Sequence, residues 1–257
     1  MNIFDQVVLD LSGPVPANFD TFIPGPNAAV VAIARAMAQG QNFDNDNQSS
    51  SQQHNRGQQH QSLSWMYITG QRGSGRTHLL FACCQAARDA DLEAVYVSYQ
   101  RRPPHLPIDL EGIEDADLVA LDDVDAIAGE KAWEEGLFHF LNRARSRGTA
   151  LIMAASQTPV DAGFTLPDLR SRLNWGQRYW LQPLADGDLE QVVRTHAASR
   201  RLPINEKTLS YLLNHGPSNA ADQLLLLDQL EKSAFANKRK PSLNLAVNIV
   251  QRFMAEQ

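Results

Sequence analysis

Short apolar runs alternate with longer stretches of helical periodicity along the middle of the chain. The runs predict buried strands and the longer stretches predict helices, at 65–69, 77–90, 94–99, 117–122, 132–147 and 150–156. Continuous apolar strands separated by helices are typical of a parallel sheet that is covered on both faces. We therefore predict an α/β domain over residues 19–182.

After Pro183 the apolar positions recur only at helical spacing. Turn residues divide this part of the chain into four predicted helices, at 186–201, 205–215, 218–237 and 243–254. Residues 183–257 are therefore predicted to form a small all-helical domain.

The N-terminal part is less regular. Residues 1–18 predict an extended tail, and the turn Pro24–Asn27 precedes a predicted helix that begins at Ala28. Residues 41–62 are almost all Gln, Asn, Ser, His and Asp, so they cannot bury enough apolar surface to offset the entropy of ordering. We predict a mobile polar loop there, and its histidines lack the Cys or paired carboxylates that would favour a metal site.

Composition narrows the class of partners and the compartment. The formal net charge is −6 and the pI is about 5.6, which disfavours tight, unassisted binding to duplex DNA. The two cysteines are adjacent, Cys83 and Cys84, which argues against a disulfide framework or a zinc site and favours a reducing compartment. Neither a signal-like N-terminus nor an apolar run of membrane-spanning length is present. We expect a cytoplasmic protein without a membrane partner.

A glycine-rich segment carries the strongest chemical signal. It has the spacing of a P-loop, except for an arginine in place of the usual lysine, and runs Gly70-Gln71-Arg72-Gly73-Ser74-Gly75-Arg76-Thr77. Such a loop surrounds a phosphate with backbone N–H groups, and the Thr77 hydroxyl is a candidate Mg²⁺ ligand. A glycine-rich turn without a ligand is the alternative. The position between a predicted strand and a predicted helix favours binding of ADP or ATP.

Arg76 changes what this site is expected to do. A guanidinium is wider and more planar than the ammonium of lysine and prefers bidentate contacts. We expect nucleotide binding to survive this change, whereas hydrolysis is expected to be slow, with a resting ADP complex as a hypothesis.

Two carboxylates follow the third predicted strand. Asp122 is a candidate Mg²⁺ ligand and Asp123 occupies the position of the acid that activates water. Asp123 is one methylene shorter than the usual Glu, which again favours weak hydrolysis. Ser156 ends the next strand and is a candidate sensor of the terminal phosphate. For both the acidic pair and Ser156, a turn or a helix cap is the alternative.

Two further segments are candidates for contacts with a partner. Arg170 and Arg172 are candidates for an arginine finger that reaches a neighbouring nucleotide, or for surface arginines paired with Asp168. The tail segment Gln6–Leu11 has the spacing of a peptide that docks in a hydrophobic groove, with an edge strand or a disordered end as the alternatives.

Together these motifs resemble the replication-initiator branch of the AAA+ proteins, and within it the DnaA-related regulators. The resemblance runs from about Phe19 to the C-terminus, apart from the polar stretch. The segments that carry it are Phe19–Gly25, Gly75–Leu80, Asp122–Gly129, Trp133-Glu134, Leu141–Arg143, Leu166–Leu169, Ser171–Leu173 and Trp175-Gly176.

The resemblance implies an AAA+ domain followed by a helical lid, and a function in trans. In such a regulator the arginine finger, here Arg172, promotes hydrolysis of the ATP held by DnaA, while the protein sits on the DNA-loaded sliding clamp of DNA polymerase III. Ser156 takes the place of sensor 1. The resemblance further implies that residues at the adenine site and P-loop bind nucleotide and that tail residues bind the clamp: Ile23, Pro24 and His78 in the first set, and Gln6, Leu9 and Leu11 in the second.

Three departures from the family pattern leave questions open. Val7 replaces the usual Leu in the clamp peptide, Ala221 stands where the lid normally carries the sensor-2 arginine, and residues 41–62 are an insertion. A helix-turn-helix for sequence-specific DNA binding is not expected. A self-sufficient AAA+ ATPase, such as a helicase loader or a clamp-loader-like motor, is the main alternative, and a homodimer remains open.

Overall fold

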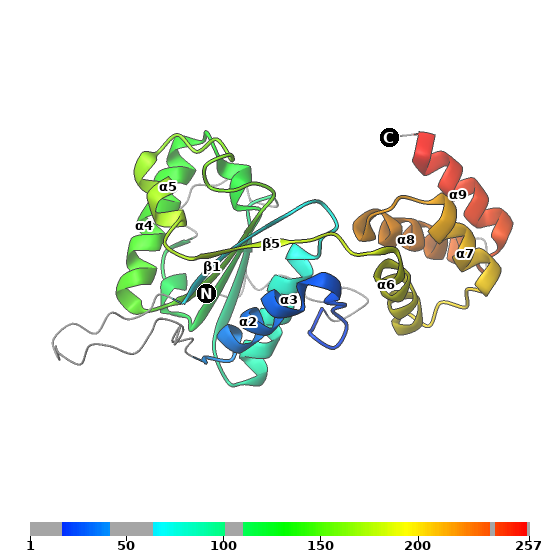
Figure 1. Cartoon of the computed structure of the whole chain (residues 1–257), viewed down its shortest axis with the longest axis horizontal. Coiled ribbons are helices and arrows are strands. Elements are labelled where there is room, and N and C mark those ends of the chain that lie inside the picture. The colour runs from blue at the N-terminus through cyan, green and yellow to red at the C-terminus, as the bar shows by residue number, and fades with distance from the viewer. Residues whose placement is uncertain (1–16, 42–63, 101–109, 237–239, 256–257) are drawn as a thin grey trace.

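Five parallel strands form a single sheet in the order β2-β3-β4-β1-β5 (Figure 1). The computed structural model describes residues 17–41, 64–100, 110–236 and 240–255. The strands are β1 (Trp65–Gly70), β2 (Ala94–Ser98), β3 (Leu118–Asp122), β4 (Ala150–Ala155) and β5 (Gln177–Leu181). The predicted α/β class with a parallel sheet is confirmed.

Helices cover both faces of this sheet (Figure 1). One face carries α2 (Ala28–Ala38), which follows a 3₁₀ turn at Gly25–Asn27, and α3 (Arg76–Asp89). The other face carries α4 (Lys131–Arg147) and α5 (Pro167–Leu173), with short 3₁₀ turns at Ile113–Asp115 and Val124–Ile127. Each face therefore has its own buried layer of side chains.

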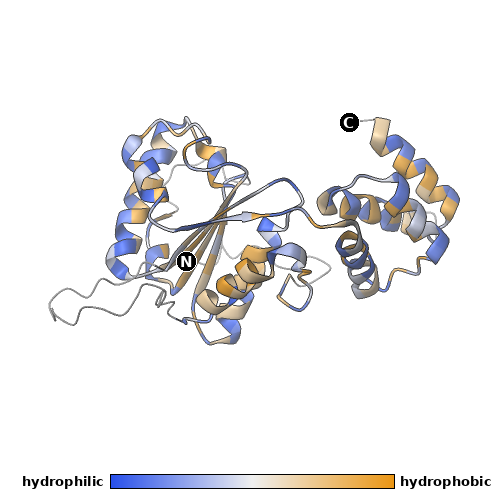
Figure 2. Ribbon diagram, in the orientation of Figure 1, coloured by the Kyte–Doolittle hydropathy of each residue, from blue (hydrophilic) through white to orange (hydrophobic). Residues whose placement is uncertain are grey.

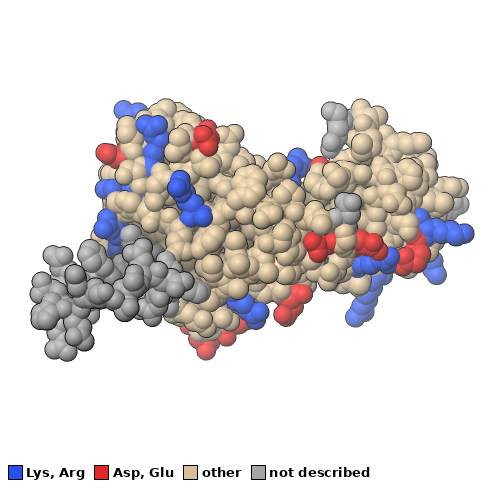
Figure 3. Space-filling view, viewed as in Figure 1, with Lys and Arg blue, Asp and Glu red and all other residues tan. Residues whose placement is uncertain are grey.

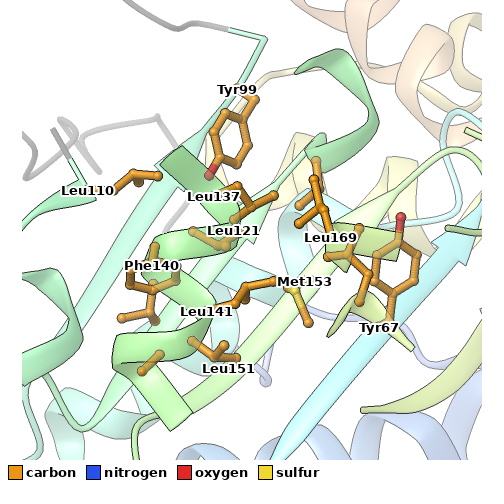
Figure 4. Close-up of a cluster of buried hydrophobic side chains, with 14 of the residues drawn as sticks. Tyr67, Tyr99, Leu110, Leu121, Leu137, Phe140, Leu141, Leu151, Met153 and Leu169 are labelled. Atoms are coloured by element: carbon orange, nitrogen blue, oxygen red, sulfur yellow. The ribbon is translucent and has the colours of Figure 1, made fainter. Parts of the chain in front are cut away.

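The alternation of side chains along β1 divides the two cores. Successive residues of a strand point to opposite faces. Tyr67 accordingly belongs to the buried cluster on the α4 side that also contains Met153 and Phe140 (Figure 4), and Ile68 belongs to the cluster on the α3 side that contains Leu80. All five of these side chains are fully buried. β1 is thus fixed from both faces, and the loop that follows it starts from a rigid base.

The remaining helices form a separate group, named here the C-terminal bundle. It consists of α6 (Asp186–Ser199), α7 (Glu206–His215), α8 (Ala220–Ala236) and α9 (Leu243–Ala255). Val193, Leu212, Leu226 and Ala246 are fully buried in its core. The helices of this bundle carry apolar and polar residues on different faces (Figure 2), as expected for helices that pack around a core of their own.

One strand and one α-helix of the sheet domain were not predicted from the sequence. β5 is an edge strand in which only Leu181 is buried, so it lacks the continuous apolar run that marks the other strands. α5 has only seven residues, too few for a clear helical period. Residues 1–16 of the predicted tail (1–18) and nearly all of the predicted polar loop lie outside the described residues.

Both cysteines lie on the buried side of α3 and are free thiols. Burial raises the pKa of both thiols, and that of Cys84 reaches about 12 despite the opposing effect of Arg88. Among the described residues, no helix combines the length and the apolar character needed to cross a membrane.

Candidate functional site

The P-loop joins the end of β1 to the start of α3. Gly73 and Gly75 have positive φ angles of 82° and 92°, which residues with a side chain rarely adopt. A Cβ atom on Gly70 would lie only 2.5 Å from Ser74 Oγ, so the loop folds back tightly over its own beginning. The predicted motif thus forms a compact strand–loop–helix turn.

A pocket of about 640 Å³ opens over this loop. The lining comes from the P-loop, from the segment 17–23, and from α6 and α8 of the C-terminal bundle. The predicted site residues in its lining are Ile23, Arg72, Gly73, Ser74, Gly75, Arg76, Thr77, His78 and Asp123. Three predicted nucleotide contacts, Pro24, Gly70 and Gln71, are not part of the lining.

Two buried polar atoms of the P-loop region have no partner, and both belong to residues that line the pocket. Ser74 Oγ and Arg76 Nη1 are inaccessible to solvent and have no hydrogen-bond partner among the described residues. An unpaired buried donor is costly, and a charged one more so, unless a ligand satisfies it. Both groups can donate hydrogen bonds, and Arg76 is cationic. The chemistry of this cradle therefore fits a phosphate group.

A different environment surrounds His78 at the start of α3. Its Nε2 lies 3.3 Å from both the Asn18 carbonyl oxygen and the Thr21 hydroxyl oxygen. The imidazole and the Phe22 ring pack edge to face, with 5.1 Å between the ring centroids. Burial lowers the pKa of His78, against the opposing effect of the Asn18 carbonyl. Burial and Arg200 likewise lower the pKa of His196 on α6. Both imidazoles line the pocket, and the lowered pKa of each favours its uncharged form.

Asp122 and Asp123 separate into two different positions. Asp122 is buried and accepts hydrogen bonds from Tyr96 Oη at 2.8 Å and from the Asp123 backbone N–H at 3.0 Å. Asp123 has a φ of 52° and lines the pocket, which Asp122 does not. A non-glycine residue with positive φ at the end of a strand is often held there for function. Tyr96, which also stacks on Phe81 at 4.2 Å, was not identified from the sequence.

Ser156 does not line the pocket. It follows β4, and both its backbone N–H and its hydroxyl donate to the Asp125 carboxylate. The structure therefore brings Ser156 to Asp125 and leaves its contact with a phosphate a prediction.

Arg172 lies on α5, on the sheet face opposite α3, and is not part of the pocket lining. Its guanidinium is 4.3 Å from the Trp175 ring and 4.9 Å from the Phe138 ring, and its Nε donates to Asn142 Oδ1. Among the described residues, the ion pairs include none between Arg172 and Asp168. Aromatic rings and an amide therefore hold this cation without neutralising it.

A buried carboxylate fixes the segment that leads into α5. Glu134 on α4 is fully buried and accepts hydrogen bonds from the backbone N–H groups of Gly129, Thr165 and Leu166, and from the Thr165 hydroxyl. Burial alone would raise its pKa, but these hydrogen bonds together hold the pKa below its usual range. Glu134 thereby positions the start of the helix that carries Arg172.

Glu134→Gln should lower the free energy of unfolding by about 2 kcal/mol at neutral pH, because an amide cannot accept all of these hydrogen bonds. The pKa of Glu134 is lower in the folded than in the unfolded protein, so its stabilisation is present above the unfolded pKa and is lost as the pH falls through the folded pKa. Denaturant unfolding of both proteins across this range checks the prediction. A difference that persists undiminished at the acid end would contradict it.

Other predicted residues fall outside the site or outside the description. Gln6, Leu9 and Leu11 lie outside the described residues, as do the histidines of the polar stretch. Within the described ranges, no cluster of three or more His, Cys, Asp or Glu side chains is arranged to hold a metal ion.

No protein-family model matches the chain. Among solved structures, domain III of the replication initiation protein DnaA from Thermotoga maritima is similar with a TM-score of 0.73 and 17% identity, over 92% of this chain and 96% of that chain. A DnaA bound to AMPPCP and single-stranded DNA gives a TM-score of 0.59 and 18% identity, over 86% of this chain and 68% of that one. The RuvB Holliday junction branch migration motor of Thermotoga maritima gives a TM-score of 0.62 and 15% identity, over 93% of this chain and 72% of that chain. The chain therefore has the AAA+ fold, with a five-stranded parallel sheet followed by helices, that DnaA domain III and RuvB share.

Proposed function

We propose that this chain is a cytoplasmic, DnaA-related regulator of replication initiation, of the Hda type. It binds ADP or ATP in the pocket over the P-loop and supplies Arg172 to the ATP held by DnaA. Hydrolysis of that ATP leaves DnaA in a form that does not start another round. The observation that carries this proposal is that Arg172 lies outside the chain's own pocket, on the other face of the sheet.

The surface around Arg172 supports action on an anionic partner. Lys and Arg side chains predominate at the end of the molecule where α4 and α5 lie (Figure 3), although the chain as a whole is acidic. Arg145 stacks on the same Trp175 ring at 4.2 Å. A rigid cation in such a surrounding is suited to the charge that develops on a transferring phosphoryl group.

In its own pocket the nucleotide is proposed to have a structural role. The P-loop N–H groups and Arg76 would hold its phosphates, and Ile23 and His78 would contact the base. A DnaA structure of the same fold is bound to AMPPCP, which supports nucleotide binding by a chain of this fold. The C-terminal bundle, which contributes residues of α6 and α8 to the pocket lining, would act as a lid.

Magnesium is the implied partner of this nucleotide. Thr77 would hold it directly and Asp122 through water, and the ion would neutralise phosphate charge. The Asp122 carboxylate accepts two hydrogen bonds, from Tyr96 and the Asp123 N–H, and a carboxylate has about four lone-pair positions. Asp122 thus keeps acceptor positions for a water of a hydrated ion, while Thr77 and Asp123 are the candidate ligands that line the pocket itself.

A self-sufficient AAA+ motor is the second candidate. Asp123 lines the pocket, where it could activate water, and RuvB has the same fold. The arginine in the lysine position, the short acid and the engagement of Ser156 by Asp125 favour weak intrinsic turnover instead. The two candidates differ in the rate at which the isolated chain hydrolyses ATP.

The test is hydrolysis of ATP already bound to DnaA, with DNA-loaded sliding clamp present. The chain should accelerate this hydrolysis, while its own ATPase activity stays low. No acceleration, together with appreciable turnover by the isolated chain, would support the motor instead.

Removal of residues 1–11 should abolish the clamp-dependent part of the acceleration, because Gln6, Leu9 and Leu11 are the proposed clamp contacts. Nucleotide affinity should stay unchanged, since the described lining of the pocket begins at Ala17. Full stimulation by the shortened chain would contradict the assignment of the tail.

A further inference from the structure

The P-loop is in direct contact with the beginning of α8. A Cβ atom on Gly73 would lie 3.0 Å from Asn219 Oδ1 and 3.2 Å from the Ala221 backbone nitrogen. Only a glycine at this position allows the loop and the helix to approach so closely. A shift in the position of the start of α8 would therefore displace the phosphate-binding loop.

An ion pair joins the same two segments. Arg72 Nη2 lies 2.7 Å from Asp222 Oδ1. The second Asp222 oxygen accepts from Asn219 Nδ2 at 2.9 Å, while the Asp222 N–H donates to Asn219 Oδ1 at 2.9 Å. The Asp222 side chain is 7% exposed and that of Arg72 is 70% exposed. Asp222 is therefore the fixed member of the pair, and Arg72 is the member that could turn elsewhere.

The Arg72–Asp222 ion pair determines how much positive charge the phosphates of a nucleotide would meet where α8 lines the pocket. Arg72 and Ala221 both line the pocket, next to the P-loop. Ala221 offers no charge, and the charge of Arg72 is balanced by Asp222. Of the cationic residues in the described lining, Arg76 alone has a buried nitrogen without a partner.

We propose that Asp222 sets the balance between diphosphate and triphosphate nucleotides by keeping Arg72 from the terminal phosphate. The inference rests on the proposed nucleotide site and adds a specificity residue to it. A third phosphate brings additional negative charge, and its binding depends on a nearby cation. With Arg72 held by Asp222, ATP gains little over ADP from this wall of the pocket.

The test is the ratio of the dissociation constants of ADP and ATP, measured by calorimetry with magnesium present. Asp222→Asn keeps the shape of the side chain and its bond to Asn219 but removes the charge. It should shift the ratio toward ATP by roughly three- to tenfold, a modest range because solvent screens an exposed arginine. The ratio is informative because a general loosening of the C-terminal bundle would weaken the binding of ADP and of ATP by the same factor and leave the ratio unchanged.

A double variant decides whether Arg72 is responsible, and a third variant tests whether a cation at this wall favours ATP. In the double variant Arg72→Gln with Asp222→Asn the shift should disappear. Ala221→Arg, which adds a cation at the same wall, should shift the ratio toward ATP in the presence of native Asp222.

Two results would overturn the inference alone: a ratio for Asp222→Asn within about twofold of the unaltered chain, or a shift that persists in the double variant. Failure of the unaltered chain to bind either nucleotide would overturn the proposed nucleotide site as well, so the two failures are distinguishable.

Discussion

Replacing Arg172 with alanine is expected to reduce the stimulated hydrolysis of DnaA-bound ATP by about a thousandfold, the lower end of what an arginine finger contributes. The reason is geometric: the guanidinium is held by Trp175, Phe138 and Asn142, and no carboxylate of the described residues forms an ion pair with it. The affinity of the variant for its own nucleotide should not change, because Arg172 is not part of its pocket. Single-turnover hydrolysis with clamp and DNA present measures the first effect, and calorimetry the second.

Arg170→Ala is the matched control for this experiment. Arg170 is exposed and lies two residues away on the same helix. Its removal should change the rate by less than about tenfold through loss of positive charge near the contact. Equal losses in the two variants would argue that α5 contributes general charge, and retained stimulation in Arg172→Ala would refute the arginine finger.

Arg76→Ala should lower the affinity for nucleotide and raise the free energy of unfolding of the nucleotide-free protein. The affinity for ADP is expected to fall by about a hundredfold, the range for hydrogen bonds to charged groups. The nucleotide-free protein should become more stable by about 1 kcal/mol, because the variant no longer buries a donor without a partner. Calorimetric titration and denaturant unfolding in the absence of nucleotide measure the two effects.

Arg88→Ala serves as the control, since Arg88 lies in the last turn of the same helix and donates to the Ala94 carbonyl. It should leave nucleotide affinity unchanged. An Arg76→Ala protein that binds ADP normally would remove Arg76 from the phosphate site. One that is less stable without nucleotide would show that Arg76 has a structural partner.

The sequence predicted those parts of the site that depend on neighbours along the chain. The P-loop was identified because its glycines, the preceding strand and the following helix are consecutive, and backbone geometry alone then fixes the turn. The central strands were predicted because they are buried on both faces. β5, an exposed edge strand, left no such pattern.

Contacts between distant segments were not predictable in the same way. No local pattern relates Tyr96 to Asp122, or Arg72 to Asp222, because each pair depends on how separate elements pack. Ser156 shows the reverse case: its position at the end of β4 was predicted, but Asp125, thirty-one residues earlier, determines what it binds. Hydrogen bonds between distant segments therefore determine what a residue at the end of a strand binds. Its position in the sequence does not.

The buried cysteines have a consequence for labelling chemistry. Their thiolates are scarce at neutral pH and inaccessible, so maleimides should not react with them while the protein is folded. A cysteine placed at exposed Gln39, beside the sheet, and another at exposed Gln229, on α8, would then be selectively modified. Spectroscopic probes at these two positions would report the distance between the parallel sheet and the C-terminal bundle without any change to the native thiols.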